Sequence, residues 1–217
     1  MSFKIKDCAL SAIATDFRAH NLSELRNCLV DVPPASVYYH FWGCLLRPRF
    51  DDPEYINDFA VWAYRALHDV VLAERLSIVD PTEFSDLELL RTELLEILEE
   101  RLDESEWVGW APAGSPFHFL RSQIVVFDTN RRVESPQELF AALPSLSGAS
   151  VFYHFIDARR RNPEGIDDFR AWMADLGDEF SGLCHDLAGL DPYFMSLIAL
   201  RDKLADVLSR HVGGGAA

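Results

Sequence analysis

Two copies of a Tyr-His-Phe tripeptide place a histidine where it could do chemistry. The histidines are His40 and His154, and each is followed by an aspartate, Asp58 or Asp168, at the start of an Asp-Phe-x-x-Trp segment. A histidine oriented by a carboxylate can act as a general base, and the same residue types can bind metals. These four residues are therefore the candidates for a catalytic role.

A structural interpretation of the same residues competes with catalysis, and we favour it. A histidine on an aromatic helix face commonly forms a buried hydrogen bond with an aspartate at the start of the next helix, which links the two helices. Two copies favour this interpretation, because duplication preserves contacts that determine a fold. The chain also lacks the common nucleotide, hydrolase and zinc-protease motifs. We predict a non-enzymatic protein without a cofactor or a metal site.

Aromatic side chains and arginines form a second set of candidates, for binding. Both residue types often anchor interfaces. Three of the arginines are consecutive, and pairing with the chain's own carboxylates is the alternative interpretation of that patch. The binding candidates are Tyr39, Trp62, Arg91, Tyr153, Arg159, Arg160, Arg161, Trp172 and Arg201.

An internal repeat organises these residues. Residues 36–41 read SVYYHF and residues 150–155 read SVFYHF, a shift of 114 positions (150 − 36). The same shift aligns Thr15 with Thr129, and later landmarks keep their order after small length changes. We predict two tandem homologous modules.

The module boundaries follow from this alignment. We expect a first module at 1–104, a connector at 105–116, a second module at 117–211 and a disordered tail at 212–217. The connector holds Trp107 and Trp110, and because of these two indoles we expect the connector to pack on a module.

The predicted fold is mainly α with a small β component, an α+β protein. Each module opens with a short strand, at 3–10 or 117–129, and we expect the two strands to pair in a shared small sheet because one strand cannot bury itself. Apolar periodicity then predicts helices in each module. They are at 22–29, at an aromatic segment capped by Ser36, at a segment capped by Asn57 or Asp58, and at 87–102. In the second module they are at 136–143, after Ser150, after Asp167 or Asp168, and at 197–208.

Charge and composition exclude several classes of function. The chain has 217 residues and a net charge of −15, which argues against nucleic acid as the main ligand. No secretory signal or membrane-spanning apolar run is visible, and four scattered cysteines fit a reduced chain. We expect a cytoplasmic protein with no membrane or nucleic-acid partner.

The order of SVYYHFW, NDFAVW, LAERL, SVFYHFIDARRR, DDFRAW and LDPYF resembles a bacterial family known only as a domain of unknown function. The resemblance covers nearly the whole chain and implies no reaction or site residue. It implies an association with carbohydrate-metabolism enzymes, notably glycosyltransferases.

Three functions follow as hypotheses. The first is a non-enzymatic interaction or regulatory protein with a protein partner, for which a glycosyltransferase-type enzyme is the candidate. The second is a sugar or sugar-phosphate binding protein or enzyme, using the His, Asp and Arg groups in a cleft between modules. The third is a structural homo-oligomer.

Overall fold

The computed structural model describes residues 2–47, 54–104 and 107–212. Most of the tail expected at 212–217 lies outside the described residues, and Val212 ends the last helix.

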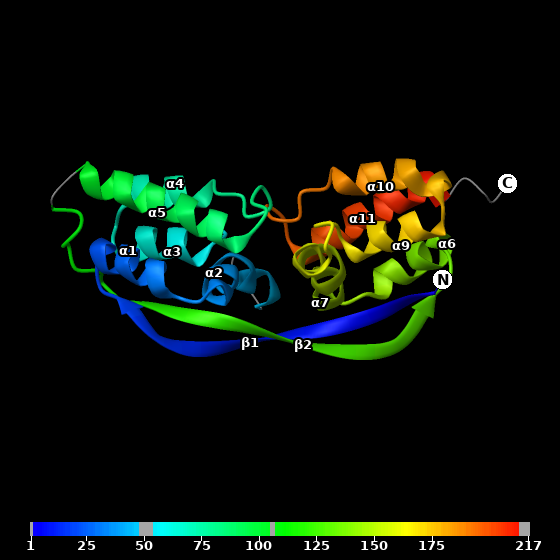
Figure 1. The fold of residues 1–217 in the computed structure, drawn as a ribbon, viewed down its shortest axis with the longest axis horizontal. Helices are drawn as coiled ribbons and strands as arrows, with labels where there is room; N and C mark the ends of the chain where they lie inside the picture. The colour runs from blue at the N-terminus through cyan, green and yellow to red at the C-terminus, as the bar shows by residue number, and fades with distance from the viewer. Residues whose placement is uncertain (1, 48–53, 105–106, 213–217) are drawn as a thin grey trace. The chain divides into compact units, whose positions relative to one another are not determined.

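Two long antiparallel strands form one sheet, as Figure 1 shows. They are β1, Phe3–Ala19, and β2, Phe117–Val133. Mainly helical structure with one two-stranded sheet makes the fold α+β, which confirms the predicted class. Both strands extend beyond their predicted ends, because the added residues are largely polar or exposed and carry no apolar alternation that would mark a strand.

The chain divides into two compact units. The α1–α5 unit is Leu10–Gln123, and the α6–α11 unit is Met1–Ala9 together with Ile124–Ala217. Each strand therefore contributes one part to each unit. Helices α2 and α3 of the first half contact the start of β2, and α7, the segment that follows it and α9 of the second half contact the start of β1.

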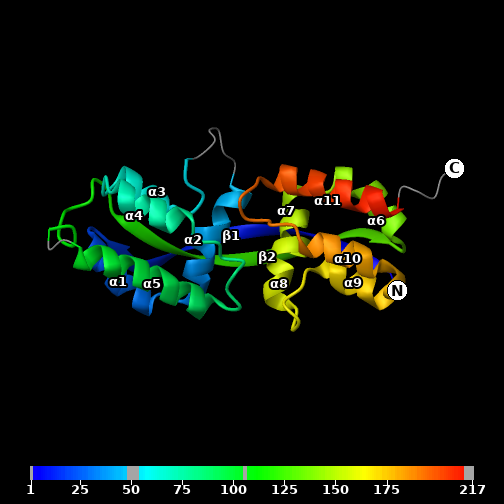
Figure 2. The same cartoon turned by 90° about the horizontal axis from the view of Figure 1, so that it is seen from above.

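The α1–α5 unit packs its helices mainly in pairs, α1 against α5 and α3 against α4 (Figures 1 and 2). Helix α2 contacts both α3 and α5. The helices are α1, Leu22–Asp31, α2, Pro34–Leu46, α3, Asp58–Arg65, α4, Val70–Ser77, and α5, Leu87–Asp103.

The α6–α11 unit places its long last helix against α6, α7 and α10. Its helices are α6, Pro136–Ala142, α7, Gly148–Val151, α8, Ala158–Arg161, α9, Asp168–Leu176, α10, Ser181–Ala188, and α11, Leu197–Val212. A π-helical segment, Phe152–Asp157, joins α7 to α8. Short 3-10 turns lie at Leu143–Ser145 and Asp178–Phe180.

Side-chain caps fix several of the helix starts. Asn57 accepts a hydrogen bond from the Ala60 N–H at the start of α3, and Asp167 accepts one from the Arg170 N–H at the start of α9. Ser135 caps α6, with Pro136 at the first helical position as predicted.

The predicted caps Ser36 and Ser150 are wrong. Helix α2 starts two residues before Ser36, at Pro34, because proline is favoured in a first turn. Helix α7 is capped by Ser147 instead. Both predicted serines lie inside their helices, where their hydroxyls bond to a strand.

In the part of the chain that the structure describes, no helix combines the length and the apolar character needed to cross a bilayer.

Candidate functional site

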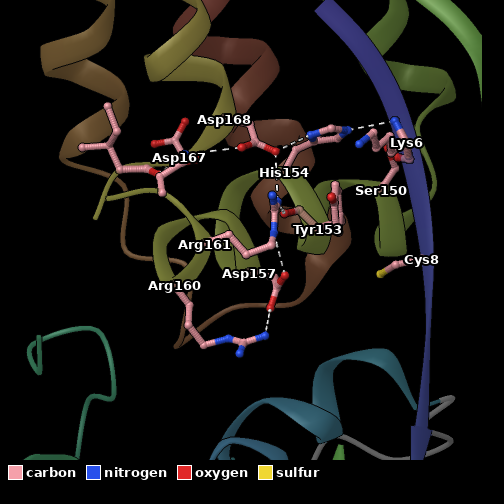
Figure 3. Close-up of polar contacts among 12 residues, drawn as sticks. Lys6, Cys8, Ser150, Tyr153, His154, Asp157, Arg160, Arg161, Asp167 and Asp168 are labelled. Atoms are coloured by element: carbon pink, nitrogen blue, oxygen red, sulfur yellow. Dashed lines mark hydrogen bonds and ion pairs between the residues drawn. The ribbon is translucent and has the colours of Figure 1, made fainter. Parts of the chain in front are cut away.

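His154 bridges three elements of the α6–α11 unit, as Figure 3 shows. Its Nδ1 lies 2.8 Å from an Oδ2 of Asp168 at the start of α9, and its Nε2 accepts a hydrogen bond from the Lys6 backbone N–H of β1 at 2.9 Å. Because the Lys6 amide can only donate, Nε2 is unprotonated and the proton is on Nδ1. The imidazole is therefore a neutral link between a strand and a helix start.

His40 makes the same bridge in the α1–α5 unit. Its Nδ1 lies 2.9 Å from Asp58 Oδ2 at the start of α3, and its Nε2 accepts from the Leu120 N–H of β2 at 3.0 Å. Burial lowers the pKa of His40, although the hydrogen bond to Asp58 acts in the opposite direction. The low pKa agrees with the neutral form that the Leu120 amide requires.

Aromatic rings enclose both histidines, each of which is 2% exposed. The His154 ring centroid lies 4.8 Å from that of Phe3 and 5.0 Å from that of Tyr153. The His40 ring has matching neighbours, with Phe117 at 4.7 Å and Tyr39 at 5.2 Å. Neither imidazole lies open to solvent.

The two internal serines complete the link to the strands. Ser150 Oγ donates to the Lys6 carbonyl at 2.7 Å, and Ser36 Oγ donates to the Leu120 carbonyl at 2.7 Å. Lys6 and Leu120 thus have both backbone groups bonded to one helix, through a serine and a histidine four residues apart. This satisfies strand groups that a two-stranded sheet would otherwise leave without a protein partner.

An arginine forms an ion pair with the aspartate of each bridge. Arg161 NH2 lies 3.0 Å from Asp168 Oδ2, and its guanidinium stacks 4.0 Å from the Tyr153 ring centroid. Burial by itself would raise the pKa of Asp168, but hydrogen bonds from His154 and Arg161 outweigh it and the pKa is lowered.

The arginine of the other unit is Arg47, which lies 2.9 Å from Asp58 and 5.2 Å from the Tyr39 ring centroid. Burial would raise the pKa of Asp58 too, and hydrogen bonds from His40 and then Arg47 lower it. Both aspartates are therefore carboxylates at neutral pH.

Asp157 distinguishes the two sites. It is buried in the π-helical segment, and its two oxygens bind Arg160 at 3.0 Å and Arg161 at 2.9 Å. At the same shift of 114, its counterpart is Gly43. A Cβ on Gly43 would lie 3.0 Å from the Tyr39 ring, so a side chain at this position would require that ring to shift. Sequence reasoning missed Asp157, although its spacing to Arg160 and Arg161 marks helical ion pairs.

The bridges occupy both nitrogens of each histidine, so neither imidazole is free to act as a general base. A general base needs a free nitrogen within reach of a substrate proton, but both nitrogens of each histidine bind the protein itself. Within the described ranges no group of three or more His, Cys, Asp or Glu side chains is arranged to hold a metal ion.

The binding candidates are mostly internal. Tyr39, Trp62, Tyr153, Trp172 and Arg91 are buried, and Arg91 NH1 donates to the Leu29 carbonyl at 2.6 Å. Arg201 is partly exposed and donates to the Leu146 carbonyl at 3.3 Å. The three consecutive arginines contact residues of their own unit: Arg160 and Arg161 pair with Asp157, Arg161 also binds Asp168, and Arg159 lies 4.9 Å over the Phe155 ring.

The two most exposed aromatic side chains of the described residues lie in the connector. Trp107 is 86% exposed and Trp110 is 75% exposed, so the two indoles themselves contribute little to the packing of the connector. The connector is fixed through its backbone: the Ser23 N–H donates to the Gly109 carbonyl at 3.2 Å, and the Ala113 N–H donates to the His20 carbonyl at 2.8 Å. Sequence reasoning read the indoles as a packing signal because tryptophan is usually largely buried.

A cavity of about 350 Å³ lies beside this turn. Its apolar wall comes from Val70 and Val71 at the start of α4 and from Val108 and Ala111 of the connector. Asp69 and Arg101 form part of its rim and bind each other at 2.8 Å. We call the two exposed indoles, the two valines of α4 and this cavity the connector surface.

Comparisons with known proteins show a family and a solved structure of similar fold, and they supply no activity. A family model described as a family of unknown function (DUF5752) matches residues 1–209. The solved structure of OrfY from Thermoproteus tenax is similar, with a TM-score of 0.85 and 26% identity, over 99% of this chain and 97% of that chain. No curated protein matches the sequence.

Proposed function

This chain belongs to DUF5752, a family of unknown function, and we propose that it is a non-enzymatic interaction or regulatory protein that binds a protein partner through the connector surface. The proposal rests on one observation, the exposure of Trp107 and Trp110 on an anchored turn. Exposed tryptophans on a fixed backbone have the properties of interface anchors, because large rigid side chains lose little entropy on binding.

The bridging histidines support the same proposal, because a structural role for them leaves function to other residues. We propose that the chain arose by duplication of one module, and that the His40 and His154 bridges are the scaffold retained in both copies. Matched contacts support this history: the histidines and their strand amides are related by a shift of 114 residues and their aspartates by a shift of 110, and each histidine has neighbouring rings of the same kinds. A scaffold of this kind leaves function to surface groups.

The partner we propose to test first is a glycosyltransferase-type carbohydrate enzyme, on the strength of the family resemblance alone. We place the interaction in the cytoplasm, because Cys8, Cys28, Cys44 and Cys184 are all free thiols.

Photo-crosslinking in the native cells tests the proposal. A photoreactive amino acid replaces Trp107 or Trp110, and the matched control carries it at Ile198, an exposed apolar residue of α11. We expect one protein to crosslink from the connector positions and not from position 198.

Binding of the purified partner to the purified chain tests whether the crosslinked protein binds through the two tryptophans. With the purified partner, Trp107→Ala with Trp110→Ala should weaken binding by at least about tenfold, as removal of a hot spot does. A partner bound equally well by this variant, or no product beyond that from position 198, would remove the proposal. A crosslink to a second copy of this chain would instead favour a homo-oligomer.

A further inference from the structure

The connector surface includes a cavity of mixed polarity, in which the charged lining residues Asp69 and Arg101 already neutralise each other. Arg101 binds Asp69 at 2.8 Å and Glu104 at 2.6 Å, so its guanidinium is engaged on both sides. An anionic ligand would have to displace these carboxylates. The wall formed by Val70, Val71 and Val108 instead suits an aliphatic or aromatic side chain.

The turn beside the cavity is held in a fixed position by Gly109. A Cβ at this residue would lie 2.7 Å from Ser23 Oγ and 2.9 Å from Leu102 Cδ2, so the backbone lies directly against α1 and α5. Trp107 and Trp110 flank this contact on both sides. Their indoles are therefore exposed on a backbone that is already ordered, which lowers the entropic cost of binding.

The neighbouring end of α5 carries negative charge that the protein does not neutralise. Glu96, Glu100 and Asp103 are exposed and share one helix face at spacings of four and three residues. In the ranges that the structure describes, none of the three forms an ion pair, whereas Glu99 pairs with Arg26 and Glu104 with Arg75.

These carboxylates also oppose the helix dipole. The C-terminal end of a helix carries partial negative charge, so Glu100 and Asp103 in the last turn of α5 destabilise the helix. A surface charge that costs stability has a natural explanation if it contacts a partner. The unpaired carboxylates favour a positively charged partner. Exposed indole faces do so as well, because they attract lysine and arginine by cation–π interaction.

We propose that the connector surface binds a basic segment of a partner protein. An apolar side chain of that segment fills the cavity between α4 and the connector, and flanking arginines or lysines face the Glu100 and Asp103 carboxylates and the two indoles. The chain's overall excess of acidic residues, 35 against 20 basic ones, accelerates association with such a segment. This inference rests on the proposed function and adds the chemistry of the partner.

Two synthetic peptides without tryptophan test this assignment on the full chain. One carries a single leucine flanked by arginines, and the other has glutamate at each arginine position. The arginine peptide should shift the indole emission to shorter wavelength and protect it from acrylamide, because Trp42, Trp62 and Trp172 are buried and Trp107 and Trp110 dominate the exposed signal. The glutamate peptide should do neither.

Fluorescence anisotropy of the labelled arginine peptide then compares variants. Trp107→Ala with Trp110→Ala should raise the Kd by at least about tenfold, and Ile198→Ala should leave it unchanged. Binding should weaken between about 0.1 M and about 1 M salt, over which the Debye length falls from about 10 to about 3 Å. Equal affinity of the tryptophan variant and the native protein would overturn the inference.

The carboxylates give a readout that a purely structural role would not produce. Glu100→Gln with Asp103→Asn should weaken peptide binding several-fold and at the same time raise the Tm, because it relieves the unfavourable interaction with the helix dipole. Asp175→Asn with Glu179→Gln, two exposed carboxylates of the other unit, is the matched control and should leave peptide binding unchanged. Unchanged binding in the α5 variant would refute the basic partner.

A neutral oligosaccharide is the second probe. Protection of the indoles by the oligosaccharide, without binding of the arginine peptide, would assign the surface to sugars and overturn the inference. The two proposals fail separately. A crosslinked and reconstituted partner with no arginine-peptide binding would leave the proposed function standing, and peptide binding with no crosslinked partner would remove the proposed function.

Discussion

At the scale of single residues, each bridging histidine acts as a hydrogen-bond connector with two fixed ends. One nitrogen accepts from a strand amide and the other donates to an aspartate, so the ring joins a strand to the start of a helix. Burial disfavours a charged ring, whereas an amide donor requires a neutral one. The surrounding phenylalanines and the strand amide therefore favour the same protonation state.

Removing one bridge should destabilise the fold. His154→Ala leaves the Lys6 amide and a partly buried carboxylate of Asp168 without their partner, and it opens space among aromatic rings. The expected loss is about 3 kcal/mol in the free energy of unfolding, measured by urea denaturation. His185→Ala, at an exposed position of α10, should cost less than about 0.5 kcal/mol. Equal effects of the two changes would contradict the bridge.

Stability should fall as the pH falls, in two steps. The pKa of His40 is lowered in the folded state, so below about pH 6.5 protons bind the unfolded chain first and favour it. The pKa values of Asp58 and Asp168 are also lowered, so their contribution is full above about pH 4 and is lost below it.

Urea denaturation at a series of pH values measures these steps. His40→Gln cannot titrate and should flatten the first step, whereas His185→Gln should keep the native profile. A free energy of unfolding that rises from pH 7 to pH 5 would contradict the neutral, buried histidine.

The sequence predicted the histidine and aspartate pairs but not the third partner of each. The repeat and the helix-start position of Asp58 and Asp168 bring the pairs together. The strand amides that occupy Nε2 could not be predicted, because Lys6 and Leu120 interact through their backbones and any residue type supplies an N–H. Arg47 was missed because it binds Asp58 across an interval with no helical periodicity.

At the scale of elements, each strand completes helices from the other half of the sequence. Phe3 of β1 lies 5.4 Å from Phe169 and 5.3 Å from Trp172, between ring centroids. Phe117 of β2 lies 5.1 Å from Phe59 and 5.7 Å from Trp62. The two phenylalanines therefore occupy equivalent environments in different units.

Because each strand packs on helices from the other half of the sequence, a substitution in a strand should loosen the helices of that other half. Two equivalent substitutions test this. Phe117→Ala should cost about 3–5 kcal/mol and speed hydrogen exchange mainly in α2 and α3. Phe3→Ala should cost a similar amount and act mainly on the π-helical segment and α9. Hydrogen exchange with mass spectrometry reads both patterns, and each variant is the control for the other. If Phe3→Ala loosened the helices of its own half instead, the exchange would be refuted.

Helices were more predictable than strands for a physical reason. Helix α5 repeats apolar residues at helical spacing over four turns, and its start has an aspartate cap. In contrast, β2 buries Phe117, Phe119 and Val133 while most of the residues between them are exposed. A strand held by backbone hydrogen bonds and one partner strand leaves little apolar pattern to read.

At the scale of the whole molecule, neither half of the sequence contains a complete unit. Residues 1–104 lack the β2 segment of the α1–α5 unit, and residues 117–217 lack the β1 segment of the α6–α11 unit. We expect each half alone to lack a cooperative unfolding transition, and an equimolar mixture to regain it. Circular dichroism during urea denaturation measures both.

Further measurements distinguish halves that depend on each other from halves that fold independently. A half that unfolds cooperatively by itself, with the same midpoint in the mixture, would show that its helices need no strand from elsewhere. Mixing with a half that carries Phe117→Ala is the control, and it should restore less stability than the native half.

The sequence repeat could not predict this arrangement. An alignment at a shift of 114 residues reports which positions are equivalent, and it says nothing about which copy's strand a helix packs on. Pairing of each strand with its own helices or with the other half's helices gives the same apolar pattern in the sequence. Contacts in the structure, such as those of Lys6 with His154 and Leu120 with His40, distinguish the two arrangements.

The exchanged strands also constrain how the protein can fold during synthesis. Helices α1 to α5 leave the ribosome before the residues around Phe117 that close their core. The backbone of Lys6 waits for a histidine that lies 148 positions later in the chain. Closing such a long loop delays folding, so the nascent chain exposes apolar surface at least until His154 has left the ribosome. Its yield in a cell should therefore depend on chaperones that protect unfinished chains.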